Sequence, residues 1–329
     1  MKALVYTAPL EVTYRDEPDP ALEAGEVVLR IDAVGICGSD MHAYHGHDPR
    51  RNPPLILGHE LSGTVVAGPN LGKRFTANPL ITCGRCDYCV QGRNNLCSNR
   101  TMVGMTRPGA FAERMSIPAS SLVEIPADMD ARTAALTEPA ATALHALNLS
   151  MRAMHRPLAE GKLLVIGGGA IGMLAALLAK HLGCVDIRVA ETNALRRESV
   201  ARHAGVGAFD PLAVPVAEAS MDLVVDAVGA KATRNAAFAA VKPGGVIMHV
   251  GLQDWASEID MRKLTLAEIT LLGTYTYSTA DLRATVAALR AGAFGDLAWV
   301  EERPLAEGAR AFRDLHEGRS ASAKIVLRP

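Results

Sequence analysis

Aromatic residues are scarce in this chain of 329 residues, where they make up 4% of the sequence. An excess of charge of one sign is also missing, because the formal net charge is −1 and no basic tract occurs. Nucleic-acid-binding proteins need basic patches, often with aromatic platforms, and polybasic clusters attach chains to anionic membranes. The composition therefore argues against a nucleic-acid partner and against a polybasic membrane anchor.

The sequence also lacks a convincing membrane-spanning run. Leu163–Ala179 carries no charge, but it sits at the lower limit of a bilayer span and contains four glycines. We interpret it as a strand, a glycine turn and a helix. The N-terminal stretch Met1–Tyr6 is strand-like and has no apolar signal region, so we expect no membrane partner and a cytoplasmic location.

Cysteine is too sparse for a secreted disulfide scaffold, with six residues in the whole chain. Four of them, Cys83, Cys86, Cys89 and Cys97, are spaced Cys-x2-Cys-x2-Cys-x7-Cys. Four thiolates can close a tetrahedral zinc site that leaves no open position, so this spacing predicts a structural zinc. Disulfides, free thiols and a nucleic-acid-binding zinc knuckle are the alternatives, and the neutral, aromatic-poor composition disfavours the last.

Two short motifs predict a second metal site of a different kind. Gly35–His42 contains Cys37, and Gly58–Glu60 contains His59 beside a carboxylate. Cysteine, histidine and carboxylate are the zinc ligands of proteins, and a catalytic zinc needs only three of them because one position stays open. Our hypothesis is that Cys37, His59 and a carboxylate hold a catalytic zinc. Taken alone, Cys37 could be a small buried apolar residue, and His59 could belong to a surface pair.

A further carboxylate lies at an interruption of a helical pattern. Ala131–Ala146 has helical tendency, and Thr137–Pro139 breaks it. A proline at that place suits the start of a helix. Glu138 could therefore point inward, or it could be an acid at a helix end that the macrodipole favours.

From Lys162 onward, strands and helices alternate. The predicted strand Leu163–Ile166 leads into a glycine motif, and the helix Ala170–His181 follows. This is the context in which G-x-G-x-x-G binds a dinucleotide, with the pyrophosphate at the helix N-terminus. The motif residues expected at the cofactor are Gly167, Gly169, Ala170, Ile171 and Gly172.

The next predicted strand, Asp186–Ala190, ends at Glu191, about twenty residues beyond the glycine motif. A carboxylate there accepts hydrogen bonds from the adenosine ribose and repels a 2′-phosphate, so NAD is favoured over NADP. Arg196 and Arg197 lie close enough in sequence to accommodate that phosphate instead. All three could also belong to a solvated helix start.

The rest of the chain continues the alternation and returns to a strand. We expect strands at Leu223–Val228, Val246–Val250 and Ile269–Leu272, a helix from the cap Ser278 to Ala291, a helix at Leu305–Glu317 and a closing strand at Lys324–Leu327. Around these later strands we add Val250, Leu252 and Thr274 to the expected cofactor site.

Taken together, these motifs resemble the zinc-dependent medium-chain alcohol dehydrogenase family over nearly the whole chain. Thr137–Pro139 resembles the sorbitol, polyol and threonine dehydrogenase branch. The resemblance implies an α/β protein with a GroES-like β-rich catalytic domain, residues 1–145 and 296–329, that carries the structural-zinc lobe at 83–97. A doubly wound Rossmann domain, residues 146–295, would bind NAD. The active cleft would lie between the two.

The resemblance also implies roles for individual residues. Cys37 and His59 resemble the catalytic-zinc ligands, and Glu60 and Glu138 resemble alternative third ligands. Asp40 resembles the carboxylate that orients the ligating histidine. The proton relay would consist of Ser39 and His42. Residues considered for the substrate pocket are Tyr44, His45, Met105, Arg107 and Phe111, whereas His47 is expected to be a plain loop histidine.

The motifs and the resemblance together imply an enzyme with two zinc ions per chain that transfers hydride between NAD and a secondary alcohol or ketone of a polyol or sugar-like substrate. The family is usually oligomeric, so a homodimer or homotetramer is expected. One alternative is an NADP-dependent dehydrogenase of aliphatic secondary alcohols or amino alcohols. A more distant alternative is a zinc- and nucleotide-binding protein without catalysis, which would have no use for a proton relay.

Overall fold

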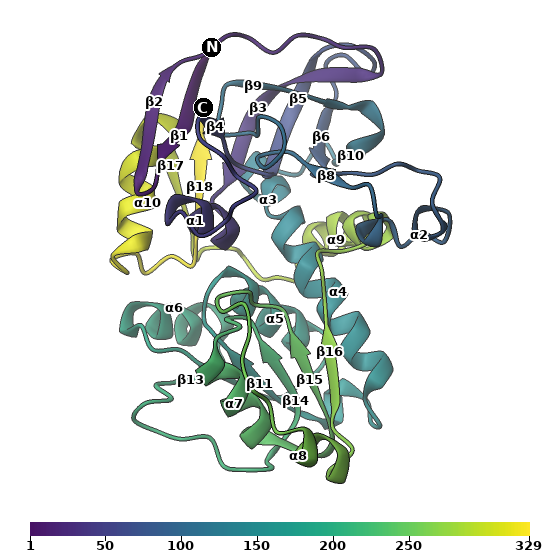
Figure 1. Ribbon diagram of the computed structural model, residues 1–329, viewed down its shortest axis with the longest axis vertical. Coiled ribbons are helices and arrows are strands. Elements are labelled where there is room, and N and C mark those ends of the chain that lie inside the picture. Colours follow the sequence, from purple (N-terminus) through teal and green to yellow (C-terminus); the bar gives the residue numbers. More distant parts are fainter.

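Two halves stack along the long axis of the molecule in the computed structural model, which describes residues 1–329 (Figure 1). The N-terminal part and the C-terminal end form the upper half in this view. The middle of the chain forms the lower half, and helix α4 runs from one half into the other.

The upper half is built from β-sheets. A three-stranded sheet has the order β2-β1-β4, a seven-stranded sheet has the order β10-β6-β5-β3-β18-β17 with β9 paired to β3, and β7 pairs with β8. The strands are β1 (Lys2–Ala8), β2 (Glu11–Asp16), β3 (Glu26–Gly35), β4 (Leu55–Ile56), β5 (Glu60–Ala67), β6 (Arg74–Ala77), β7 (Leu80–Ile81), β8 (Thr101–Met102), β9 (Arg114–Pro118), β10 (Leu122–Glu124), β17 (Val300–Pro304) and β18 (Lys324–Arg328).

The closing strand completes the sheet that carries the metal-ligand motifs. β18 pairs antiparallel with β3, with Val326 opposite Gly35 and Leu327 opposite Val34. Because β3 also pairs with β5, the start of β18 lies near the residues that follow β3 and precede β5. The last residues of the chain are thereby brought beside its first motif.

The lower half is a six-stranded parallel sheet with the order β13-β12-β11-β14-β15-β16. Four of its five crossovers contain a helix, whereas residues 210–220 join β13 to β14 without one, and the strand order reverses between β11 and β14. The strands are β11 (Lys162–Ile166), β12 (Asp186–Ala190), β13 (Gly207–Phe209), β14 (Met221–Asp226), β15 (Val241–His249) and β16 (Thr270–Gly273).

Helices cover both faces of the parallel sheet. One core, of 41 buried residues, joins α4, α5, α6 and α9 to one face, and another, of 11, joins α7 to the opposite face. The helices are α1 (Gly38–Tyr44), α2 (Asp87–Val90), α3 (Ala131–Ala135), α4 (Thr137–Ala153), α5 (Ala170–His181), α6 (Ala194–Ala204), α7 (Lys231–Ala240), α8 (Met261–Leu266), α9 (Thr279–Arg290) and α10 (Gly308–His316), with 3₁₀ turns η1 (Asn94–Leu96), η2 (Ala119–Ser121), η3 (Leu158–Glu160) and η4 (Leu305–Glu307). None of the helices combines the length and apolarity needed to cross a membrane.

The α/β fold class predicted from the sequence is confirmed, and several elements have the predicted bounds. The helix at Ala170–His181 is α5 without change, and Ser278 caps α9 through a reciprocal capping box with Asp281. Other expectations were wrong in detail. The final helix is divided into η4 and α10, and the helix expected to end at Ala146 is α4, which extends to Ala153.

Candidate active site

The first motif folds into a short helix whose N-cap is Cys37. The Cys37 backbone N–H donates to the Asp40 carboxylate at 3.0 Å, and the Ser39 N–H points at the Cys37 sulfur, 3.5 Å away. This reciprocal cap aims the thiol away from the helix and toward the start of β5. There the Cys37 sulfur, a ring nitrogen of His59 and a carboxylate oxygen of Glu60 all lie within 4.8 Å of one another.

Asp40 fixes the orientation of the histidine. His59 Nδ1 and Asp40 Oδ1 face each other at 3.5 Å, and neither buried atom has any other partner. Burial acts to raise the pKa of Asp40, but His59, Arg51 and the Cys37 backbone outweigh it, and the pKa is lowered. A carboxylate behind Nδ1 leaves Nε2 free for a ligand, which is the arrangement that orients histidines in metal sites.

The carboxylate of the cluster, Glu60, is held by a lysine from the other end of the chain. Lys324 Nζ donates to both Glu60 oxygens at 2.7 and 2.6 Å and to the Ile36 carbonyl at 2.8 Å. Lys324 is 2% exposed and Glu60 is fully buried. A Cβ on Gly35 would overlap the Glu60 carboxylate, which explains why glycine ends β3 here.

Glu138 stands beside this group in the first turn of α4. The Tyr277 hydroxyl donates to Glu138 Oε1 at 2.9 Å, and both side chains are buried. Burial, with the like charge of Glu60 adding to it, raises the pKa of Glu138 to about 7. Glu138 is not one of the three residues whose ligand atoms lie within 4.8 Å of one another.

The electrostatics of the cluster fit a bound cation. Burial acts to lower the pKa of His59, yet the Asp40 carboxylate and the Cys37 thiol overcome it, so the pKa lies well above the usual value. A thiol, an imidazole and a carboxylate are the donors that zinc takes in catalytic sites. The residues present therefore fit a zinc ion.

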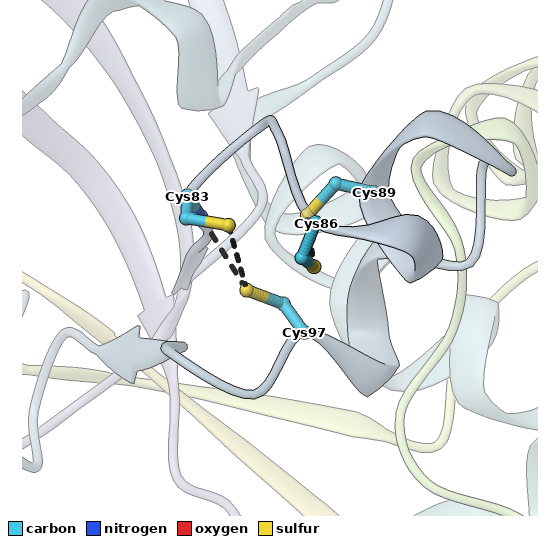
Figure 2. Close-up of side chains that lie close together, drawn as sticks. All are labelled: Cys83, Cys86, Cys89 and Cys97. Carbon is cyan, nitrogen blue, oxygen red and sulfur yellow. Dashed lines mark hydrogen bonds between the residues drawn. The ribbon is translucent and has the colours of Figure 1, made fainter.

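The other four cysteines form a separate cluster (Figure 2), in the lobe around α2 at the side of the upper half (Figure 1). The sulfurs of Cys83 and Cys97 are 3.6 Å apart, and those of Cys86 and Cys89 are 3.5 Å apart. Sulfurs bound tetrahedrally at about 2.3 Å would be about 3.8 Å apart, so the cluster needs little adjustment to hold zinc. None of the four is in a disulfide.

The thiols of this cluster perturb one another's pKa values. Backbone N–H groups of Arg85 and Cys86 lower the pKa of Cys83 to about 6. Desolvation and the neighbouring Cys86 thiol raise the pKa of Cys89 to about 11. Four thiolates cannot be ionised together at these distances unless a cation neutralises them, and zinc supplies two charges.

A cleft of about 630 Å³ joins the first cluster to the glycine motif. Cys37, Glu60 and His42 line it from the upper half. From the lower half it is lined by Gly167, Gly169, Ala170, Ile171, Gly172, Glu191 and Arg196. Val250, Leu252 and Thr274, also expected at the cofactor, do not line this cleft, and the Leu252 side chain is 70% exposed.

The glycine motif is shaped as its sequence predicts. A Cβ on Gly172 would overlap the Gly167 carbonyl oxygen, so only glycine lets α5 approach the end of β11 this closely. A Cβ on Gly169, by contrast, would have no atom within 4 Å. The turn is thus tight on its inner side and open on the side that faces the cleft.

Besides the ribose contact that we expect for it, Glu191 makes two hydrogen bonds within the protein. Its carboxylate accepts the Gly168 N–H and the Asn193 N–H, each at 2.7 Å. Arg197 is occupied by the Glu191 and Thr192 carbonyls. Arg196 differs, because its Nε is buried without a partner while the residue lines the cleft.

Some of the other predicted residues line the cleft and others do not. Ser39 Oγ lies 3.4 Å from His59 Nε2, and His42 lines the cleft half-buried. Of the residues considered for the substrate pocket, only His45 lines the cleft, together with His47, which we expected to be a plain loop residue. The other four do not line it: Tyr44 and Phe111 are core residues, Met105 is half-buried in a turn, and Arg107 forms an ion pair with Glu26 at 2.7 Å.

Sequence reasoning missed three side chains that act on this cluster. Lys324 begins an apolar closing strand. A lysine next to such an apolar run is a sequence signal for a buried charge, which needs a partner of opposite charge. Tyr277 offered no local signal, because its partner is 139 positions away in the sequence. Arg51 is fully buried, and it donates to the Gly104 carbonyl and to Ser39 Oγ.

Two protein-family models match this chain. Residues 23–127 match the alcohol dehydrogenase GroES-like domain, and residues 170–291 match the zinc-binding dehydrogenase domain. Together they cover more than half of the sequence. The chain therefore belongs to the zinc-dependent medium-chain alcohol dehydrogenase family, in its polyol dehydrogenase branch.

Relatives with named activities are similar to this chain over most of its length. A 2-dehydro-3-deoxy-L-galactonate 5-dehydrogenase of Pseudoalteromonas atlantica is 33% identical over 93% of this chain and 92% of its own. An L-galactonate-5-dehydrogenase of Escherichia coli K12 is 32% identical over 83% of this chain and 82% of its own. Among solved structures, an acetophenone reductase of Geotrichum candidum in complex with NAD is 29% identical, with a TM-score of 0.86 over 100% of this chain and 97% of its own.

Proposed function

We propose that this protein is a zinc-dependent oxidoreductase that transfers hydride between NAD and a secondary alcohol or ketone of a polyol or sugar-acid substrate. The observation that carries the proposal is that one cleft is lined both by the Cys37 and Glu60 ligand group and by the glycine motif. A metal-bound substrate and a dinucleotide could then meet in it. The named activities of the two relatives support a sugar-derived substrate.

Cys37 and His59 would hold the catalytic zinc, with Glu60 or Glu138 as the third ligand. Zinc bound there would supply Lewis-acid stabilisation of a substrate oxygen, and the nicotinamide would carry the hydride. The second zinc would be held by Cys83, Cys86, Cys89 and Cys97 and would stabilise the lobe.

The proton that accompanies hydride transfer needs a path, which we assign to Ser39 and His42. Ser39 Oγ accepts a hydrogen bond from Arg51 at 3.2 Å and lies 3.4 Å from His59 Nε2, so its own hydrogen would be free for the substrate side once zinc is bound to Nε2. Burial and the neighbouring His47 lower the pKa of His42, which keeps it neutral and able to accept a proton near pH 7. Asp40 would hold His59 in the tautomer that leaves Nε2 unprotonated.

Glu191 supports NAD as the preferred cofactor. It is fixed by two backbone N–H groups at the cleft wall, where its carboxylate would accept ribose hydroxyls and repel a 2′-phosphate. Arg196 favours the opposite preference because its Nε lacks a partner. We assign NAD because a fixed carboxylate is a direct obstacle to the phosphate.

We also propose a homodimer or homotetramer in a reducing compartment such as the cytoplasm. β16 is an edge strand of the parallel sheet, and exposed edges commonly pair. Five large apolar residues within this strand or in the twenty residues before it are exposed: Leu252, Trp255, Met261, Leu266 and Leu271. The lobe needs reduced thiols to bind metal. Light scattering of the purified protein measures the assembly, and a monomer would exclude this part of the proposal.

The deciding experiment is zinc content by mass spectrometry together with NAD reduction on a panel of polyols and sugar acids. Wild type is expected to hold two zinc ions per chain and to reduce NAD. Cys37→Ser is expected to hold one zinc ion and to lose turnover while it still binds NAD. Cys184→Ser is the matched control, because Cys184 is a buried cysteine outside both clusters. Two zinc ions and full activity in Cys37→Ser would contradict the proposal.

A further inference from the structure

One short segment connects the two metal clusters. It runs from Tyr275 to Thr279, between the end of β16 and the first turn of α9. The lobe lies against one side of it, because Asn94 of η1 hydrogen-bonds to Thr279. The candidate catalytic site lies at its other side, through Tyr277 and Glu138.

The lobe holds this segment with two adjacent asparagines of η1, which lie between Cys89 and Cys97. Asn94 accepts the Thr279 N–H at 3.1 Å and donates to the Thr279 hydroxyl at 2.9 Å. Asn95, which is 4% exposed, donates to the Tyr275 carbonyl at 2.8 Å. The four-cysteine loop thereby fixes both ends of the segment.

The residue in the middle of the segment has a conformation that it would not adopt alone. Thr276 has φ +47°, in the left-handed region that β-branched residues avoid, and its hydroxyl is buried without a partner. Such a conformation persists only where the surroundings impose it, and it is typical of functional sites. The surroundings here are the asparagine contacts on both sides of Thr276 and the buried ring of Tyr277.

Tyr277 is placed by this conformation with its ring fully buried and its hydroxyl on Glu138 Oε1 at 2.9 Å. One Glu138 oxygen is thus occupied, and the other remains available to a metal. We propose that Tyr277 is a positioning residue for Glu138 as a ligand of the catalytic zinc, and that the four-cysteine lobe sets its position through Asn94 and Asn95. This inference builds on the proposed function, and it gives the lobe a part in tuning the catalytic site.

The test measures how tightly the catalytic zinc is held. Tyr277→Phe removes one hydroxyl from a buried ring, and loss of such an outer-shell partner costs metal sites roughly 10- to 100-fold in affinity. We expect that decrease in chelator competition, and a changed absorption spectrum when Co²⁺ replaces zinc. Cys37→Ser identifies which of the two zinc ions is released. A purely structural role would lower the unfolding temperature and leave the Co²⁺ spectrum unchanged.

A double-mutant cycle tests the link to the lobe. Asn94→Ala with Asn95→Ala is expected to weaken the catalytic zinc in the same direction, and adding Tyr277→Phe is expected to cause no further loss, because all three act through one contact. Asn95→Ala alone serves if the paired variant does not fold. Asn148→Ala is the control, because its side chain hydrogen-bonds to Asp281 of α9 and makes no hydrogen bond to the lobe or to Tyr277.

Two results would overturn the inference. If Tyr277→Phe keeps wild-type zinc affinity and Co²⁺ spectrum, Tyr277 does not position Glu138. If the asparagine variants leave the catalytic zinc unchanged, or if their effects add to that of Tyr277→Phe, the lobe does not act through it. Failure of the proposed function is a different observation, because wild type itself would then lack zinc at Cys37 or lack turnover.

Discussion

The buried ion pair between Lys324 and Glu60 allows a stability effect to be worked out from the structure. Lys324 is 2% exposed and makes three hydrogen bonds, two of them to Glu60. Lys324→Met keeps the length and apolar stem of the side chain and removes the charge. Glu60 is then left as a buried carboxylate without its cation, a change that costs about 3–5 kcal/mol in comparable sites.

For domains of about 150–250 residues, each kcal/mol shifts the unfolding temperature by about 2–4 °C. We therefore expect Lys324→Met to lower that temperature by roughly 6–20 °C in protein stripped of metal. The decrease should be smaller with zinc bound, because the ion would offer Glu60 a positive charge in place of the lysine. Differential scanning calorimetry of the two forms, each with and without the substitution, measures both effects.

Two further variants make this reasoning falsifiable. Glu60→Gln combined with Lys324→Met removes both charges, so it should be more stable than Lys324→Met alone. Lys2→Met is the matched control: Lys2 also pairs with a carboxylate from a strand, that of Asp16 at 2.8 Å, but the pair is exposed and no measurable change is expected. A metal-free Lys324→Met that unfolds at the wild-type temperature would refute the argument.

Three other substitutions test the cleft. Glu191→Ala should reduce the preference for NAD over NADP, measured as the ratio of kcat/KM values, and an unchanged ratio would remove our basis for assigning NAD. Because burial lowers the pKa of His42, the kcat/KM of wild type should fall below pH 6.5, where this base becomes protonated. His42→Ala should abolish that inflection. Gly172→Val should abolish cofactor binding in calorimetry, since a Cβ would overlap the Gly167 carbonyl, whereas Gly273→Ala adds its Cβ in open space and should bind normally.

Much of the lower half could be predicted from sequence because its signals are local. β11, the glycine motif and α5 follow one another without a gap, and glycine is required there by the close approach of Gly172 to the Gly167 carbonyl. Capping is local too, which is why the start of α9 at Ser278 was predicted correctly. The fold class and the family are confirmed for the same reason, because both depend on motifs that are contiguous in the chain.

The contacts that tune the candidate site could not be predicted, since they join distant parts of the chain. Lys324 reaches Glu60 across 264 positions, and Tyr277 reaches Glu138 across 139. A single sequence contains no signal for such pairings beyond the rule that a buried charge needs a partner. The pocket residues failed for a related reason, because Tyr44 and Phe111 pack into the core, where their apolar area is removed from water.

The two carboxylates near Cys37 differ in what neutralises them, and this difference bears on which one serves zinc. Glu60 already has a full positive charge in Lys324, so together they add nothing to the net charge of the site. Glu138 has no hydrogen-bonded cation: its partner is the neutral Tyr277 hydroxyl, and burial raises its pKa to about 7 against the more distant charges of His59 and Lys324. With a dication bound, the Cys37 thiolate and an ionised Glu138 balance the metal, whereas ligation by Glu60 alone would leave Lys324 buried without its counter-ion. Charge balance therefore supports our proposal of Glu138 as a zinc ligand, while the distances favour Glu60, whose carboxylate oxygen lies within 4.8 Å of the Cys37 sulfur and a His59 ring nitrogen; an exchange of the two carboxylates at the metal would satisfy both.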